Sequence, residues 1–238
     1  MVADSYLGLY RVDPQTGEKT LLLANSEGAE GRPFAFLNGL EISSRSGVVI
    51  ELNSLGRLLS YDPETRRVEV LLDALYMPNG VALSPGEDFL LLAETSIGRI
   101  LRYWLKGPKA GTSEVVLDNM IGYPDNIRLS ASGNAFLVGI TTPRFRKLLP
   151  PFLDMMAPYP AVKRFLAKVV PLSWYDVLLP RHALVLELAL DGGLRGSLHD
   201  PDGTLTQAVS DVFQSPGGRT YLGSTDQPYL AVLDEWQP

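Results

Sequence analysis

The chain has 238 residues, of which 45% are hydrophobic and 20% are charged, and it contains 22 glycines and 18 prolines. These values are typical of a globular, turn-rich protein with one large core. The formal net charge of −6 argues against a nucleic-acid partner, and the lack of cysteine excludes a disulfide framework.

The first segment reads as a strand directly after Met1. Its continuation, residues 8–17, matches the later segment 56–66 in apolar pattern and turn residues. We therefore expect residues 2–23 to form the outer two strands of a blade whose inner half is absent.

Short apolar runs separated by turn residues follow, which is typical of strands. The expected strands of the next two units are 38–42, 47–52, 56–61 and 67–72, then 79–83, 89–94, 98–104 and 114–117. A fourth unit runs from Asn126 through 134–140 and resumes at 182–188, and a last unit holds 209–213, 219–224 and 228–233. The pattern predicts about 17 strands, whereas six blades of four strands need about 24.

An asparagine recurs at the start of these units, and it predicts the fold. Asn38, Asn79 and Asn126 lie 41 and 47 positions apart, which is the period of propeller blades of about 40 to 50 residues. Equivalent residues of such blades converge on a common axis. We predict an all-β fold of the six-bladed β-propeller type, apparently incomplete, with about four to five blades present.

Residues 143–181 interrupt the fourth unit and differ in composition. The segment is basic and apolar, it is broken by prolines at positions 150, 151, 158, 160 and 171, and it predicts one or two short amphipathic helices. One interpretation is a lid or wall over a site. A second is contact with an anionic membrane surface, and a third is a packed ornament on the outside of the fold.

The sequence predicts neither a membrane span nor a signal peptide. No stretch reaches about 18 uninterrupted apolar residues, and the first residues lack a basic region followed by an apolar core.

Four phrases in order carry a resemblance to a known family: 77–89, 93–95, 122–128 and 197–203. They resemble the strictosidine-synthase-like family, and the match extends over nearly the whole chain. The resemblance implies a six-bladed propeller related to paraoxonases and gluconolactonases, often with calcium on the axis and arylesterase or lactonase activity. It also implies a membrane-associated or secretory location.

The chain departs from the family pattern at its start. Family members open with a blade that carries a Gly-Pro-Glu phrase, and they have a longer loop after the first asparagine strand; neither is found here. We therefore expect residues 1–238 to form a single propeller domain with a truncated first blade. Open strand edges at residues 2–12 and 228–233 would then favour self-association.

The cation site that the resemblance implies consists of Asn38, Asn79, Asp125 and Asn126. Amide and carboxylate oxygens suit calcium, which takes about six to eight ligands. An axial ion of this kind polarises an ester or lactone carbonyl and holds the charge that develops on its oxygen. The alternative is structural, because Asn-Gly and Asp-Asn are also common turn residues.

Three further residues are candidates for catalysis. By the resemblance, His199 lies near the pocket mouth and is suited to proton transfer; otherwise it is a turn histidine. Asp211 lies nearest to the position of the glutamate that strictosidine synthases proper use, and its shorter side chain argues against condensing activity. Glu94 either faces the channel or pairs with Arg99 or Arg102.

Two functions from different classes follow. The first is a calcium-dependent hydrolase of aryl esters or lactones, with the 143–181 insert forming an apolar pocket. The second is a non-catalytic propeller whose axial ion is structural and which acts by binding a partner or a membrane surface.

Overall fold

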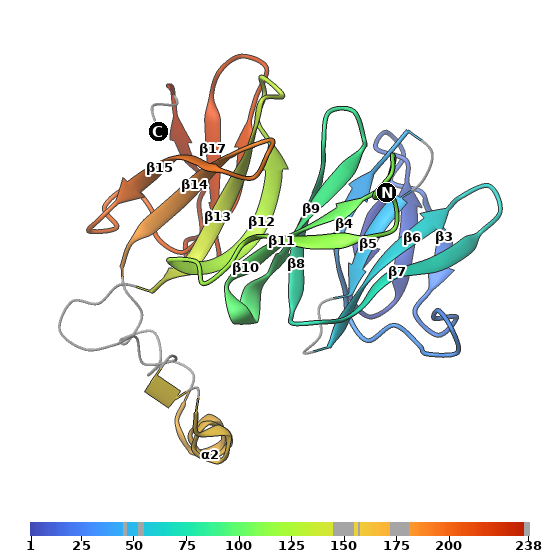
Figure 1. Cartoon of the computed structure of the whole chain (residues 1–238), viewed down its shortest axis with the longest axis horizontal. Helices are drawn as coiled ribbons and strands as arrows, with labels where there is room; N and C mark the ends of the chain where they lie inside the picture. Colours follow the sequence, from blue (N-terminus) through green and yellow to red (C-terminus); the bar gives the residue numbers. More distant parts are fainter. Residues whose placement is uncertain (45–46, 52–54, 145–154, 157, 172–180, 236–238) are drawn as a thin grey trace.

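The computed structural model describes residues 1–44, 47–51, 55–144, 155–156, 158–171 and 181–235. These residues form five antiparallel sheets (Figure 1). The first sheet contains β1 (Val2–Asp4), β2 (Gly8–Val12) and β3 (Lys19–Ala24). The second contains β4 (Leu37–Ile42), β5 (Gly47–Glu51), β6 (Gly56–Asp62) and β7 (Arg67–Leu75).

The other three sheets follow the same up-and-down order. The third contains β8 (Pro78–Leu83), β9 (Phe89–Glu94), β10 (Arg99–Trp104) and β11 (Ser113–Leu117), with a short 3₁₀ helix, η1 (Thr95–Ile97), between β9 and β10. The fourth contains β12 (Gly122–Leu129), β13 (Ala135–Pro143), β14 (Ala183–Ala189) and β15 (Leu194–Asp200). The fifth contains β16 (Val209–Gln214), β17 (Thr220–Ser224) and β18 (Ala231–Leu233).

The first strands of the five sheets are neighbours in chain order. β1 contacts β4, β4 contacts β8, β8 contacts β12 and β12 contacts β16. The sheets therefore fan out from a row of inner strands, and the first and last sheets lie at opposite ends of the molecule in Figure 1. This arrangement confirms the all-β, propeller-type fold expected from the repeat.

The first sheet differs from its prediction. Residues 2–24 form three strands, not two, because the chain reverses after Asp4. The Asp4 carboxylate accepts hydrogen bonds from the backbone N–H groups of Tyr6 and Leu7, both at 2.9 Å, which stabilises the turn into β2. An aspartate that bonds the backbone two residues on is a turn signal, and in this case it adds a short inner strand to the sheet.

The core lies between the sheets, and each central strand contributes to two layers. In β9, Leu90 and Leu92 pack toward the second sheet, whereas Leu91 and Ala93 pack toward the fourth. This alternation follows from the strand geometry, because successive side chains point to opposite faces. A strand buried on both faces reads as a continuous apolar run, as Phe89–Ala93 does.

Two Glu–Arg pairs, both with a buried glutamate, hold the starts of the inner strands. Glu51, at the end of β5, bonds Arg57 at 2.5 Å and accepts the backbone N–H of Ala35, just before β4. Glu94, at the end of β9, bonds Arg99 and accepts the backbone N–H of Tyr76, just before β8.

Glu94 is fully buried. Of the two expectations for this residue, pairing with Arg99 is confirmed, so Glu94 acts as a structural clamp.

The insert contains a helix, as expected for its described part. α2 (Pro160–Val169) begins with Pro160 in its first turn, where a proline is well tolerated. Residues 145–154, 157 and 172–180 of the predicted insert lie outside the described part, so a lid role stays a prediction.

We expect Arg57→Ala to destabilise the fold by about 3–5 kcal/mol, because it leaves the Glu51 carboxylate buried without a partner charge. Urea denaturation of the purified chain measures this. The control is Arg32→Ala, which breaks the Arg32–Asp73 pair, whose side chains are 50% and 45% exposed. Solvent screens such a pair, so its loss should cost far less stability. Equal losses of stability in the two variants would contradict the stabilising role of the Glu51–Arg57 pair.

Candidate functional site

Four inner strands carry the same irregularity at the same point. The pairing with the second strand of each sheet shifts between Leu37 and Leu40, Pro78 and Val81, Pro124 and Ile127, and Val209 and Asp211. In each case the inner strand has one residue more than its partner, which defines a β-bulge. Bulges turn side chains out of the regular pleat, and here they occur at the polar positions of the repeat.

The bulges place the predicted metal ligands Asn38, Asn79, Asp125 and Asn126 on neighbouring inner strands, and we call this group the arc. The Nδ2 of Asn38 donates to the Oδ1 of Asn79 at 2.8 Å. Gly80 lies so close to β12 that a Cβ atom there would be 2.3 Å from the carbonyl oxygen of Asp125. The Nδ2 of Asn126 donates to the backbone oxygen of Ser210, in β16, at 3.2 Å.

The structure corrects the alignment of the repeat. Pro78 pairs with Glu94 and Pro124 pairs with Ile140 at equivalent points. The residue equivalent to Asn79 is therefore Asp125, whereas the spacing had equated Asn126 with it. The correction keeps both residues in the arc, because Asp125 and Asn126 share one bulge.

Ser210 belongs to the arc and was missed by the sequence analysis. It is the bulge residue of the fifth sheet, and its hydroxyl hydrogen-bonds the Asp125 side chain. No asparagine marks the position, and a serine inside an apolar strand is a weak signal. Ala208, immediately before β16, has a positive φ of 48°, and such backbone strain gathers at functional turns.

Asp125 is the buried charge of the arc. The residue is only 7% exposed, and burial raises the pKa of its carboxyl. The hydrogen bond from Ser210 opposes this rise, and the nearby charge of Asp211 adds to it. A cation beside Asp125 would favour the ionised form.

The donor chemistry of the arc fits a hard cation. The hydrogen bonds of Asn38 and Asn126 described above use their amide nitrogens, and their carbonyl oxygens take no part in those bonds. Within the described part of the chain, no group of three or more His, Cys, Asp or Glu residues could hold a metal ion. A cation here would depend on amide oxygens around one carboxylate, a combination that calcium accepts.

A hollow of about 540 Å³ lies toward the other ends of the inner strands. Glu41, Arg128 and Asp211 line it together with apolar side chains. Arg128, in β12, donates two hydrogen bonds to Asp211, in β16, at 2.9 and 2.7 Å. The predicted catalytic residue Asp211 thus joins two inner strands.

The charged groups of this hollow influence one another. Burial raises the pKa of Glu41, and the charge of Arg128 partly offsets the rise. The hydrogen bond to Asp211 raises the pKa of Arg128. The inner strands therefore carry amide side chains and the Asp125 carboxyl near their beginnings, and the side chains of Glu41, Arg128 and Asp211 farther along.

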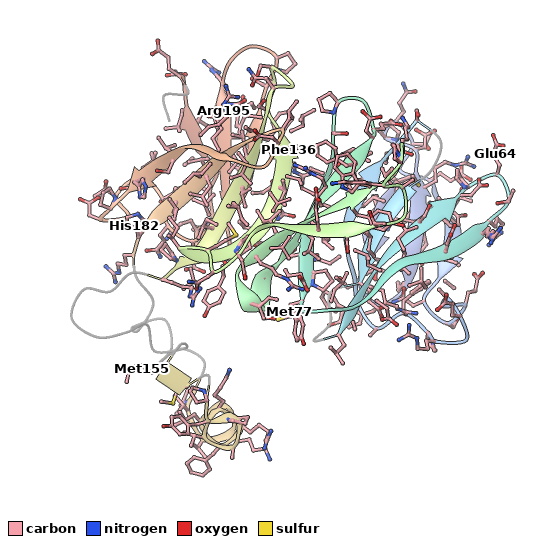
Figure 2. All side chains as sticks on the ribbon, viewed as in Figure 1. Glu64, Met77, Phe136, Met155, His182 and Arg195 are labelled. Carbon is pink, nitrogen blue, oxygen red and sulfur yellow. The ribbon has the colours of Figure 1, made fainter. Side chains whose placement is uncertain are left out.

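The structure does not bring His199 to the arc. His199 lies in β15, so the alternative of a turn histidine is wrong. β15 is three strands away from β12 in the same sheet, a separation of about 14 Å. Its Nδ1 lies 3.0 Å from the Nε2 of His182, which Figure 2 labels near the beginning of β14. A role for His199 in proton transfer stays a prediction.

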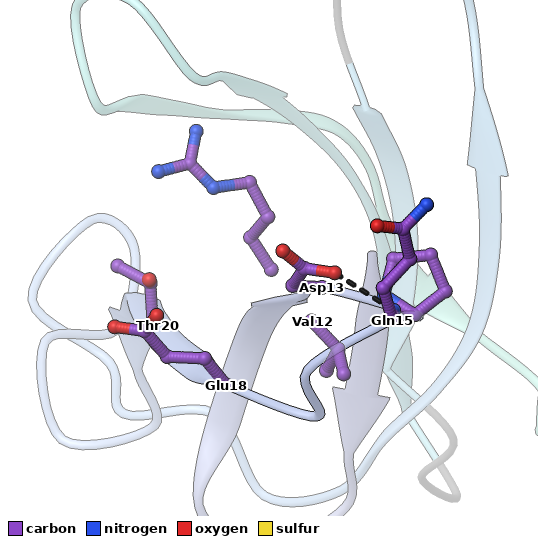
Figure 3. Close-up of a pocket in the computed structure, with 7 residues that line it drawn as sticks. Val12, Asp13, Gln15, Glu18 and Thr20 are labelled. Atoms are coloured by element: carbon purple, nitrogen blue, oxygen red, sulfur yellow. Dashed lines mark hydrogen bonds between the residues drawn. The ribbon is translucent and has the colours of Figure 1, made fainter.

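Another hollow, of about 610 Å³, lies at the turn between β2 and β3 (Figure 3). Here Asp13 accepts the backbone N–H of Gln15 at 2.8 Å. This is ordinary turn chemistry, and the lining contains none of the predicted site residues.

Comparison with known sequences supports the resemblance. The sequence profile of the Strictosidine synthase family matches residues 44–108. The chain is 40% identical to human adipocyte plasma membrane-associated protein over 252 residues, which cover 98% of this chain and 59% of that protein. It is 33% identical to strictosidine synthase-like 3 of Arabidopsis thaliana over 254 residues, covering 98% of this chain and 62% of that protein. The chain thus spans about three fifths of the length of these relatives.

Solved structures support the fold. A gluconolactonase from Xanthomonas campestris superposes with a TM-score of 0.62 at 14% identity, covering 94% of this chain and 63% of that one. A nidogen/laminin complex gives 0.65 at 9% identity, with 98% and 72% covered. The calcium-binding protein regucalcin from Agrobacterium tumefaciens gives 0.59 at 15% identity, with 94% and 64% covered. At these identities the likeness concerns the fold alone.

We expect Asp125→Asn to stabilise the cation-free protein at neutral pH. Burial raises the pKa of Asp125 in the folded chain, so its favourable contribution is present while it is protonated and is lost as the pH rises through the folded pKa. In the presence of a chelator at pH 7, the variant should therefore melt about 2–4 °C higher.

This gain should shrink as the pH falls toward about 3.5, where the carboxyl is protonated in both states. Calorimetry of the wild-type chain and the variant across this pH range measures the effect. Asp234→Asn is the control, because the Asp234 side chain is 85% exposed. A variant that melts lower than wild type at pH 7 would contradict the electrostatic account of Asp125.

Proposed function

Because the chain is homologous to the strictosidine synthase-like proteins, we propose that it is a propeller hydrolase of aryl esters or lactones that uses calcium. The observation that carries this proposal is the alignment of four β-bulges, which gathers Asn38, Asn79, Asp125 and Asn126 on the inner strands. The likeness to a gluconolactonase and to a calcium-binding regucalcin agrees with a lactone substrate and with calcium.

The residues of the arc have distinct roles in this proposal. Calcium, when bound, would polarise the substrate carbonyl and offset the negative charge that forms on its oxygen. Asp125 supplies the negative charge that attracts the ion, and Ser210 holds its carboxylate by a hydrogen bond. Asn38 and Asn126 present amide oxygens whose orientation is set by their bonds to Asn79 and Ser210.

The Arg128–Asp211 pair supports the arc from the far side. Its two hydrogen bonds join β12 to β16, the two strands that carry Asp125 and Ser210. In this proposal Asp211 is a positioning residue, because its carboxylate binds the guanidinium of Arg128.

The place where the insert leaves the fold agrees with a wall over this site. The insert follows Pro143, which pairs with Gly122 at the beginning of β12. The inner strands β4 and β8 begin at the same side of the fold as β12. The insert therefore leaves the fold at the end of the inner strands that carries Asn38 and Asn79.

We also propose a membrane-associated or secretory location. The relatives are named for association with the plasma membrane. Of the helices that the structure describes, none has both the length and the apolar character needed to cross a bilayer.

The second candidate is a non-catalytic propeller with a structural ion. The direct bonds Asn38–Asn79 and Asn126–Ser210 favour it, because they already satisfy part of the polar arc without a substrate. In this case binding of calcium would stiffen the inner strands, and the chain would act through a partner.

Calcium titration combined with esterase assays separates these functions. Wild-type chain should bind calcium with micromolar or tighter affinity, and Asp125→Ala should remove this binding. Hydrolysis of an aryl acetate or a γ-lactone should fall at least about 100-fold in Asp125→Ala, because the charge that holds the ion is lost. A chelator should give the same loss in wild type, and Asn126→Ala should weaken both readouts.

The control variant is Asp234→Ala, which removes an exposed carboxylate and should leave binding and turnover unchanged. Calcium binding without turnover on a panel of esters and lactones would favour the non-catalytic propeller. A folded chain that binds no calcium would contradict both functions.

A further inference from the structure

Helix α2 has two opposite faces of different chemistry. Its apolar residues Val162, Phe165, Leu166 and Val169 follow the i, i+3, i+4, i+7 pattern, which places them on one side of a helix. The cations are Lys163, Arg164 and Lys168, and they lie on the other side. The helix contains neither aspartate nor glutamate.

The apolar face is exposed to solvent. Phe165 is 63% exposed, Val169 55% and Val162 44%. Figure 1 shows α2 apart from the five sheets, and in Figure 2 the side chains of this segment project from the helix on several sides. This contrasts with the strands, whose leucines are mostly buried between sheets. An amphipathic helix with a solvent-exposed apolar face needs a partner surface.

The charge of α2 is opposite to that of the rest of the chain. The whole chain has a net charge of −6, whereas α2 carries three cations and no anion. None of the three cations forms an ion pair with another residue in the part of the chain that the structure describes. The surface that complements this helix is therefore anionic.

We propose that α2 docks on an anionic phospholipid surface, with Val162, Phe165 and Val169 in the acyl boundary and the lysines and arginine at the headgroups. This combination of an apolar face and a cationic face is typical of helices that lie in the membrane interface. Tyr159, directly before the helix, is 57% exposed, and tyrosines are enriched at the same depth. An acidic protein would complement the cations of α2, but it would also need an apolar groove that matches the broad apolar face.

The size of α2 defines the mode of contact. A helix of ten residues is about 15 Å long, which is half of the hydrocarbon thickness of about 30 Å. It therefore lies along the surface. Short helices are marginal in water, and burial of the apolar face in lipid would stabilise this one.

Docking would hold one end of the fold near the lipid. The insert that contains α2 leaves the fourth sheet at the end where the inner strands begin, near Asn38 and Asn79. This consequence rests on the proposed function, because it brings the candidate hydrolase site to a source of apolar esters. The binding experiment below needs no activity, so its outcome is independent of that function.

Vesicle co-sedimentation tests the proposal on the full chain. Vesicles of phosphatidylcholine with about one third phosphatidylserine should bind the chain, and vesicles of phosphatidylcholine alone should bind it much more weakly, since each cation near an anionic surface contributes about fivefold to partitioning. Binding should weaken as the salt concentration rises. Absence of binding, or equal binding to both vesicles, would overturn the proposal.

Variants assign the binding to α2. Phe165→Ser should weaken binding about tenfold or more, because it removes a large apolar side chain. Leu194→Ser is its control, because Leu194, in β15, is 58% exposed, close to the 63% of Phe165. The triple variant Lys163→Gln, Arg164→Gln, Lys168→Gln should weaken binding about a hundredfold. The matched control replaces three exposed cations of the sheets: Arg11→Gln, Lys19→Gln, Arg67→Gln.

A fluorescence measurement and a polyglutamate binding assay complete the test. In Phe165→Trp, tryptophan fluorescence should shift to shorter wavelength on addition of phosphatidylserine vesicles, as it does when an indole leaves water. If the control triple weakens binding as much as the α2 triple, the proposal is wrong. Binding of the chain to polyglutamate but not to vesicles would also overturn it and would indicate an acidic protein partner.

Discussion

A one-residue bulge at the same point of four inner strands is the constraint on which the candidate site depends. Without it, Asn38, Asn79, Asp125 and Ser210 would follow the regular pleat and each would face an apolar layer beside its sheet. The extra residue turns these polar groups toward the neighbouring inner strands, where they meet. The pairs Glu51–Arg57 and Glu94–Arg99 act one step earlier, because their buried glutamates hold the segments that lead into β4 and β8.

Much of the fold could be predicted because its signals are local. Strands buried on both faces are continuous apolar runs bounded by turn residues, and such runs in the second and third sheets were placed within a few residues of the observed strands. The repeated asparagine indicated the radial arrangement because blades repeat at a fixed period. Strand β1 was missed as a separate strand of the first sheet, because it is three residues long and depends on one turn at Asp4.

The site was predicted in part, and the errors have a common cause. Sequence spacing equated Asn126 with Asn79, whereas strand pairing equates Asp125, because a bulge changes the register without any change in residue type. The roles of Ser210 and Arg128 depend on contacts between β12 and β16. The residue pairs that join these strands are 83 and 84 positions apart in the sequence. The contact between His199 and His182 was missed, because it joins two strands whose pairing residue spacing does not reveal.

The chemistry of Asp125 argues for a cation rather than a self-sufficient polar core. Asn38 and Asn79 show that an amide pair meets the structural need at this level, with a direct hydrogen bond and no charge. A carboxylate at the equivalent position of β12 is buried, its pKa is raised, and the charge of Asp211 opposes its ionisation further. Ionised Asp125 therefore destabilises the cation-free fold at neutral pH. A bound cation would offset this by supplying the opposite charge, and binding would then be coupled to stability at this residue.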